Sequence, residues 1–350
     1  MGFSMAAGVR SLEWVEGRVR WLNTLKVPWE EEYVETSDYE RLARAIESME
    51  IRGAPAIGVA AALGVALAAS NFSGGLDELR SGLLRAIDRL SRTRPTAVNL
   101  FWALERMKEV VNREYASTEE LRESVINEAL EIYEEDVKVN IAIGEVGSKL
   151  VEDGDTVLTH CNAGSLATAG HGTALGVIRS AWYSGKRIKV IATETRPMLQ
   201  GARLTVWELM KEDIPVTLIS DSMVGYVMSR GLVSKVIVGA DRILKSGHVI
   251  NKVGTYTIAV LARHHGVPFY SAAPTSTIDP VRSVKEVVIE ERNPDEVRRV
   301  LGRLLITVPG VKVMNPAFDV TPPHLVSGII TEKGVATQPY EESIERLLKL

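Results

Sequence analysis

The chain has 350 residues, 45% of them apolar and 25% charged, which is the balance of an ordinary globular protein. A net charge of −4 without any basic block argues against a nucleic-acid binder. The length exceeds that of one usual core, so we expect two domains. Cys161 is the only cysteine, which excludes an intrachain disulfide and favours a cytoplasmic setting.

The N-terminal part shows neither a targeting signal nor a membrane span. Met1–Arg10 lacks a charged start followed by a long apolar run, and Ala6 stands where a myristoylation motif needs Ser or Thr. The uncharged stretch from Gly53 to Leu76 is rich in Ala and Gly and poor in Leu, Ile and Phe. A membrane span is more hydrophobic than this. We therefore expect a buried helix that packs closely through small side chains.

The first 140 residues are expected to be mostly helical. Asp38–Ser48 places apolar residues at the spacing of an amphipathic helix. Three later segments show the same pattern: Leu76–Leu90, Val98–Arg113 and Glu119–Leu150. Arg94-Pro95 marks a break, because a proline disfavours helical geometry in the residue before it. We place a helical domain at residues 1–148.

Short β-rich segments alternate with helical ones after Asp153-Gly154. The expected strands are Thr156–His160, Ile188–Thr193, Val216–Ser220, Lys235–Val238 and Pro268–Ser271. The expected helices are Gly176–Ser184, Ala202–Glu212, Met223–Arg230 and Thr255–His264. Such alternation predicts an α/β fold, with a Rossmann-like parallel sheet and helices on both of its faces. We place this second domain at residues 149–350.

Ligands of an open parallel sheet bind beyond the carboxyl ends of the strands. The groups expected at that edge are His160-Cys161-Asn162, Glu194-Thr195-Arg196, Asp221-Ser222, Gly239-Ala240-Asp241-Arg242 and Ala272-Ala273-Pro274. The first group continues as a loop rich in Gly, Ser and Thr that runs to Gly176. A strand, such a loop and a helix start can hold an anion through backbone N–H groups. The glycine spacing in this loop departs from the dinucleotide fingerprint, and no Walker pattern is present.

Two residues at this edge are candidates for catalysis. A free cysteine is often a buried small hydrophobe, but Cys161 lies at a strand end where N–H dipoles favour the thiolate. Asp241 follows the strand KVIVGA and precedes Arg242. It is either a helix cap, an ion-pair partner of Arg242, or a general acid whose pKa is raised by an apolar pocket. Position alone leaves these readings of Asp241 open.

Three cations could bind an anionic substrate, and no metal site is expected. Arg52, Arg94 and Lys252 are flanked by Gly, Pro or Asn rather than by helix-face charges. Arginine binds phosphate with two hydrogen bonds, and lysine acts as a point charge. The six histidines show no metal-ligand spacing beyond His264-His265, which ends a helix and is interpreted as structural.

Eight ordered segments resemble the methylthioribose-1-phosphate isomerase family of methionine salvage. They are IRGAPAIGVAAA (51–62), RPTAVNL (94–100), HCNAGSLAT (160–168), ETRPMLQGARLTVWEL (194–209), VGADRI (238–243), NKVGTY (251–256), AAPTSTID (272–279) and NPAFDVTP (315–322). The resemblance runs from about Trp14 to the C-terminal helix. One departure is Asn23-Thr24, where the family usually has an Asp-Gln pair.

The resemblance implies an aldose–ketose isomerase without cofactor or metal, assembled as a homodimer. It places the catalytic cysteine at Cys161 and the catalytic aspartate at Asp241. The substrate contacts that it implies are Arg52, Gly53, Ala54, Arg94, Gln200, Asn251 and Lys252. Arg52, Arg94 and Lys252 also stand out by their own surroundings, whereas Gly53, Ala54, Gln200 and Asn251 are implied by the resemblance alone.

Two related families remain as alternatives. Ribose-1,5-bisphosphate isomerases resemble the chain around Cys161 and Asp241, but AAPTSTID and NPAFDVTP look more like the methionine salvage enzyme. Regulatory subunits of the initiation-factor guanine-exchange complex share the fold and are not enzymes. The presence of Cys161 and Asp241 together with Arg94 and Lys252 favours catalysis. Whether Cys161 removes a proton or stabilises a hydride shift stays open.

Overall fold

The computed structural model describes residues 9–94 and 97–349, which pack as two compact units. Unit 1 contains the chain up to Ile141 together with Gly164–Gly172, and unit 2 contains Ala142–Ala163 together with the chain from Thr173 onward. The myristoylation reading at Ala6 and Pro95 of the predicted break lie outside the described residues.

Unit 1 opens with an antiparallel sheet that we did not predict. Its strands are β1 (Leu12–Val15), β2 (Arg18–Leu22) and β3 (Tyr33–Thr36), in the order β1-β2-β3. The expectation of a mostly helical first domain missed these strands because each is only four or five residues long. A segment of that length gives little periodic signal.

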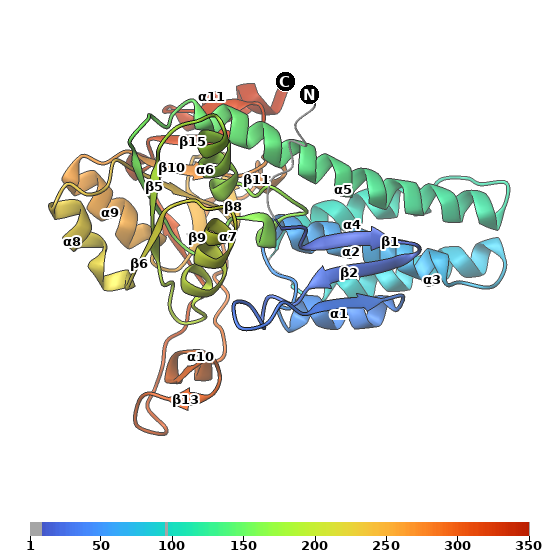
Figure 1. Ribbon diagram of the computed structural model, residues 1–350. Helices are drawn as coiled ribbons and strands as arrows, with labels where there is room; N and C mark the ends of the chain where they lie inside the picture. Colours follow the sequence, from blue (N-terminus) through green and yellow to red (C-terminus); the bar gives the residue numbers. More distant parts are fainter. Residues whose placement is uncertain (1–8, 95–96, 350) are drawn as a thin grey trace. The chain divides into compact units, whose positions relative to one another are not determined.

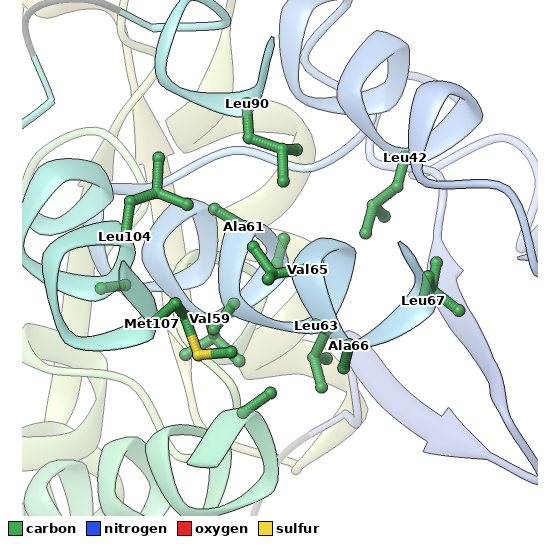
Figure 2. Packing of buried hydrophobic residues seen from close by; sticks show 14 of the residues in the cluster. Leu42, Val59, Ala61, Leu63, Val65, Ala66, Leu67, Leu90, Leu104 and Met107 are labelled. Atoms are coloured by element: carbon green, nitrogen blue, oxygen red, sulfur yellow. The ribbon is translucent and has the colours of Figure 1, made fainter. Parts of the chain in front are cut away.

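The helices of unit 1 follow the sequence prediction closely. They are α1 (Tyr39–Glu47), α2 (Ala54–Ser70), α3 (Leu76–Ser91), α4 (Val98–Val111) and α5 (Thr118–Ser148), whose last residues belong to unit 2. The uncharged stretch forms α2, which lies buried as expected. Figure 2 shows its side chains among Leu42 of α1, Leu90 of α3, and Leu104 and Met107 of α4. Among the described residues, no helix is long and apolar enough to cross a membrane.

The glycine-rich segment Gly164–Gly172 is fixed within unit 1. Its Ala169 N–H donates to Asp136 Oδ2 of α5 at 2.7 Å. Ser11 Oγ donates to the carbonyl oxygens of Ser165 and Thr168, at 2.8 and 2.9 Å. Three backbone groups of this loop therefore already form hydrogen bonds with other residues of unit 1.

Unit 2 contains the predicted parallel sheet. Its strands are β4 (Thr156–Thr159), β5 (Lys189–Thr193), β6 (Val216–Ile219), β7 (Lys235–Val238), β10 (Phe269–Ala272), β15 (Gly328–Thr331) and β16 (Gly334–Ala336). Their order is β16-β15-β10-β7-β4-β5-β6, and only β16 pairs antiparallel. The five predicted strands agree with the structure to within one residue at each end.

Helices cover both faces of this sheet, which confirms the predicted α/β class. They are α6 (Ala174–Tyr183), α7 (Val206–Lys211), α8 (Val224–Ser229), α9 (Thr255–His265) and α11 (Tyr340–Lys349). Figure 1 shows α6 and α7 on one side of the strands and α8 and α9 on the other. A turn of π-helix, Gly201–Thr205, precedes α7 where we had predicted a plain helix.

A second, four-stranded sheet in unit 2 was not predicted. It contains β8 (Arg242–Leu244), β9 (Val249–Lys252), β11 (Ile278–Asp279) and β14 (Phe318–Thr321), in the order β11-β8-β9-β14. Between β11 and β14 the chain forms α10 (Asp295–Arg298) and the hairpin of β12 (Arg299–Val300) with β13 (Leu304–Leu305). Figure 1 shows this excursion extending from the body of unit 2.

The carboxyl of Asp136 makes the stability of unit 1 depend on pH. Burial raises the pKa of Asp136 from 3.8 to about 6, although its bonds from Ala169 and Asn140 act in the opposite direction. The folded chain therefore holds a proton here between about pH 4 and 6, where the unfolded chain has lost it. Because the folded state binds this proton more tightly than the unfolded state, the free energy of unfolding decreases as the pH rises through that window.

We expect Asp136→Asn to remove this dependence. Relative to the variant, the wild-type protein should lose up to about 3 kcal/mol of unfolding free energy between pH 4 and pH 7. Urea unfolding of both proteins across this range measures the difference, in which contributions from the other carboxyls cancel. If the free energy of unfolding changed with pH in the same way in both proteins, Asp136 would not be the source of the pH dependence.

Candidate active site

The candidate catalytic residues leave neighbouring strands at one edge of the seven-stranded sheet. Cys161 follows β4, Asp241 follows β7, and Gln200 lies in the segment after β5. These strands are adjacent in the order β7-β4-β5 and run parallel. Their carboxyl ends therefore lie at the same edge, where ligands of such sheets bind.

The backbone of Cys161 is held in an unusual conformation by two threonine hydroxyls. Its φ of 61° lies in the left-handed region, which costs a non-glycine residue about 1–2 kcal/mol. Its N–H donates to Thr195 Oγ1 at 2.8 Å, and its carbonyl accepts from Thr205 Oγ1 at 2.6 Å. Both threonines are fully buried. These two bonds fix the direction in which the Cys161 side chain leaves the backbone.

Further polar groups support the two threonines and the residue after the cysteine. Asp221, which follows β6, accepts from the backbone N–H groups of Thr195 and Arg196 at 2.8 and 2.7 Å. Asn162 Nδ2 donates to Glu208 Oε1 of α7 at 2.8 Å. Glu208 is in turn paired with Arg179 of α6 at 2.7 Å, with both side chains completely buried.

Lys252 is a cation of unit 2 whose charge acts on the groups at this edge. It is the last residue of β9 and only 4% exposed, so this cation lies in a buried strand although Asn and Gly stand close to it in the sequence. Burial lowers the pKa of Lys252, while the charges of Cys161 and Asp241 raise it. The structure therefore brings Lys252 within electrostatic range of both candidate catalytic side chains. Arg292 and Glu296 are the other charged groups that act on the ammonium.

Asn251 and Asp241 are fixed by their own neighbours. Asn251 Nδ2 donates to Thr255 Oγ1 at 3.1 Å, and Thr255 Oγ1 donates to the carbonyl of Lys252 at 2.6 Å. The Asp241 N–H donates to the carbonyl of Ile250 at 2.9 Å, which ties the end of β7 to β9. Arg242 Nη1 lies 3.6 Å from Asp279 Oδ2, so Asp279 is one carboxylate that pairs with this guanidinium.

Gln200 carries a buried acceptor that is suited to a ligand. The residue is 8% exposed, and its Oε1 atom has no hydrogen-bond partner among the described residues. A buried amide oxygen in this state is destabilising by about 1–3 kcal/mol. A substrate hydroxyl is the kind of group that would satisfy it.

The remaining predicted contacts, Arg52, Gly53, Ala54 and Arg94, lie in unit 1. Gly53 has φ of 99°, and a Cβ there would meet Ala167 of the glycine-rich segment at 2.5–2.6 Å. Only glycine fits this close approach. The segment just before it is anchored by Thr24, whose Oγ1 donates to the carbonyl of Met49 at 2.9 Å. The departure at Asn23-Thr24 thus places a buried threonine that supports the segment leading to Arg52.

Sequence reasoning missed several residues that shape this site. Thr195 and Asp221 stood among the expected strand-end residues, but nothing in the sequence indicated that they hold Cys161. Thr205 and Glu208 lie on the π-helical turn and α7, where a regular helix had been predicted. The segment ETRPMLQGARLTVWEL, quoted for the resemblance, was the one signal that pointed to them.

The Thr205 bond gives a stability prediction that needs no substrate. Thr205→Val should lower the free energy of unfolding by about 1–3 kcal/mol, because the buried Cys161 carbonyl loses its donor. Thr205→Ser keeps the hydroxyl and should retain most of the stability. Thr217→Val, at an exposed position of β6, is the control. Equal losses for Thr205→Val and Thr205→Ser in urea unfolding would show that the hydroxyl is not the stabilising group.

Comparison with known proteins places the chain in a family. Residues 50–338 match the initiation factor 2 subunit family. The curated methylthioribose-1-phosphate isomerase of Thermotoga maritima is 53% identical, over 99% of this chain and 100% of its own length. The solved 5-methylthioribose 1-phosphate isomerase of Pyrococcus horikoshii OT3 is 42% identical, with a TM-score of 0.91 over 99% of this chain and 97% of its own.

A further solved structure carries a different description. The protein described as translation initiation factor eIF-2B, subunit delta, from A. fulgidus is 51% identical, with a TM-score of 0.87. The match covers 98% of this chain and 100% of that one. The chain therefore belongs to the initiation factor 2 subunit family and, within it, to the group of methylthioribose-1-phosphate isomerases.

Proposed function

We propose that the protein is an aldose–ketose isomerase of methionine salvage. It converts 5-methylthioribose 1-phosphate to 5-methylthioribulose 1-phosphate. The observation that carries the proposal is the burial of Lys252, on whose ammonium the charges of Cys161 and Asp241 act, together with the position of these two residues at the strand edge where ligands bind. The names and high identity of the relatives support the same substrate.

The chemistry follows from the structure of such a substrate. A sugar phosphorylated at its anomeric carbon cannot open freely to an aldehyde, so the enzyme has to break the bond between C1 and the ring oxygen. Asp241 donates the proton that the ring oxygen takes up as this bond breaks. Hydrogen then moves from C2 to C1, the C2 hydroxyl gives its proton to the Asp241 carboxylate, and a ketone forms at C2 with the phosphate retained at C1.

Cys161 acts at C1 and C2 in either of two ways. As a thiolate it removes the C2 proton, and the positive charge of Lys252 favours that form of the thiol. Alternatively it stabilises the transition state of a hydride shift from C2 to C1. Both routes use the same two residues, Cys161 and Asp241.

The substrate contacts that we propose divide by chemistry. Arg52, Arg94 and Lys252 bind the phosphate and its developing charge, with the backbone of Gly53 and Ala54. Gln200 and Asn251 bind sugar hydroxyls, and the orphan Oε1 of Gln200 is consistent with this role. We also propose that the protein works as a homodimer in the cytoplasm.

Two alternatives have specific support. Ribose 1,5-bisphosphate presents the same C1–C2 chemistry but carries a second phosphate in place of the methylthio group. A regulatory role in translation initiation is suggested by the description of the A. fulgidus structure, which is 51% identical. The buried Lys252 speaks against a purely regulatory role.

Turnover of two substrates tests the proposal directly. The purified protein should convert 5-methylthioribose 1-phosphate at least a hundredfold more efficiently, in kcat/KM, than ribose 1,5-bisphosphate. Product formation followed by NMR measures both rates. The reverse preference would establish the bisphosphate isomerase, and failure to convert either sugar phosphate would remove the catalytic proposal.

Substitution of the two catalytic residues tests their roles. Cys161→Ser and Asp241→Asn should each lower kcat by about three orders of magnitude or more, because each removes a group that acts on the reacting atoms. Asp153→Asn, at an exposed turn, is a control of the same chemical change and should keep normal turnover. Near-normal kcat in either folded variant would refute its assignment.

A further inference from the structure

His160 joins two segments of the proposed site through both of its ring nitrogens. Nε2 lies 2.9 Å from the carbonyl oxygen of Val253, and Nδ1 lies 2.6 Å from Thr193 Oγ1. A carbonyl can only accept, so Nε2 carries the proton and Nδ1 accepts from the threonine hydroxyl. Burial lowers the pKa of His160, which keeps the ring in this neutral form.

The segments that His160 joins each carry a reactive residue. Cys161 follows it directly in the chain, and Lys252 directly precedes Val253. Gly254 has φ of 105°, and a Cβ there would stand 3.1 Å from Nε2 and Cε1 of the ring. On its other side the Gly254 N–H donates to Asp319 Oδ2 at 2.7 Å. The turn after Lys252 is thus held between the imidazole and a carboxylate of β14.

We propose that His160 is a positioning residue: its Nε2–H bond to Val253 fixes the end of β9 that carries Lys252, and the charge of that ammonium in turn sets the reactivity of the Cys161 thiol. This inference rests on the proposed function, since it explains how the catalytic cysteine is tuned. Its test needs no substrate, because Cys161 is the only cysteine in the chain.

Several charged groups act on Lys252 and on His160, and the test has to distinguish their effects on the Cys161 thiol. The charges that act on Lys252 are those of Cys161 after β4, Asp241 after β7, and Arg292 and Glu296 of the excursion between β11 and β14. His160 is faced by Asp221 and Lys252. Of all these groups, only Lys252 is linked to His160 through the Val253 bond.

A matched pair of amides distinguishes the two ring nitrogens. Glutamine can place its amide nitrogen near the position of Nε2, whereas asparagine reaches only the position of Nδ1. His160→Gln therefore keeps a donor for the Val253 carbonyl, and His160→Asn loses it. The rate of alkylation of Cys161 by iodoacetamide, followed by mass spectrometry from pH 5 to 10, gives the apparent pKa of the thiol in each variant.

The expected result is a selective change in thiol reactivity. At pH 7, His160→Asn should react about three- to tenfold more slowly than wild type through a raised thiol pKa, and His160→Gln should stay within twofold. Lys252→Met should show the same loss as His160→Asn. The double variant should show no further loss, because both changes remove one interaction.

Several outcomes would overturn the proposal. A folded His160→Asn variant with wild-type thiol titration would show that the histidine has only a structural role. An unchanged thiol pKa in Lys252→Met would show that the ammonium does not act on Cys161. If His160→Asn does not fold, Thr193→Val supplies the test: the ring is then held by the Val253 bond alone, so a smaller rise of the thiol pKa in the same direction is expected, and a wild-type thiol titration would contradict the proposal. A protein that turns over neither sugar phosphate would refute the function while leaving the titration result intact.

Discussion

The site of unit 2 depends on one constraint, the left-handed backbone of Cys161. A strand that simply continued would direct this side chain out from one face of the sheet. The threonine hydroxyls on its N–H and carbonyl compensate the strain of the turn. Behind them, Asp221 fixes the backbone of Thr195, and Glu208 fixes Asn162. Thr195, Thr205 and Glu208 are completely buried and hydrogen-bonded, so the conformation has little freedom to relax.

The same unit contains two kinds of buried charge, and comparing them separates structure from chemistry. Arg179 is completely buried, but Glu208 and Glu212 pair with its guanidinium at 2.7 Å. Such a network holds α6 and α7 together and leaves nothing for a ligand to bind. Lys252 is nearly as buried, yet its ammonium forms no ion pair with any residue in the described part of the chain. Its stabilising neighbours are the two side chains to which we assign the reaction.

Much of this could be predicted from sequence, and the reasons for success and failure are physical. The strands β4, β5, β7 and β10 are mostly buried, so they appear as continuous apolar segments between turn residues. Once they are placed, the strand-edge rule locates Cys161 and Asp241. β9 could not be recognised, because its residues Asn251 and Lys252 are polar and their burial depends on the tertiary structure. Asp319 lies 65 residues from the Gly254 N–H that it accepts, and no local pattern predicts such a bond.

The burial of Lys252 also bears on why one family contains both isomerases and proteins described as translation factors. The threonine hydroxyls and the Arg179 network maintain the backbone whatever the protein does. A buried ammonium, in contrast, lowers stability unless a partner compensates it. A scaffold that only binds other proteins gains nothing from such a group, and an apolar residue of similar volume would be more stable there. An enzyme for an anionic substrate does gain, because the substrate supplies the missing counter-charge and the dry surroundings strengthen its attraction. Lys252 beside Cys161 and Asp241 is therefore a feature that catalysis explains and the fold alone does not.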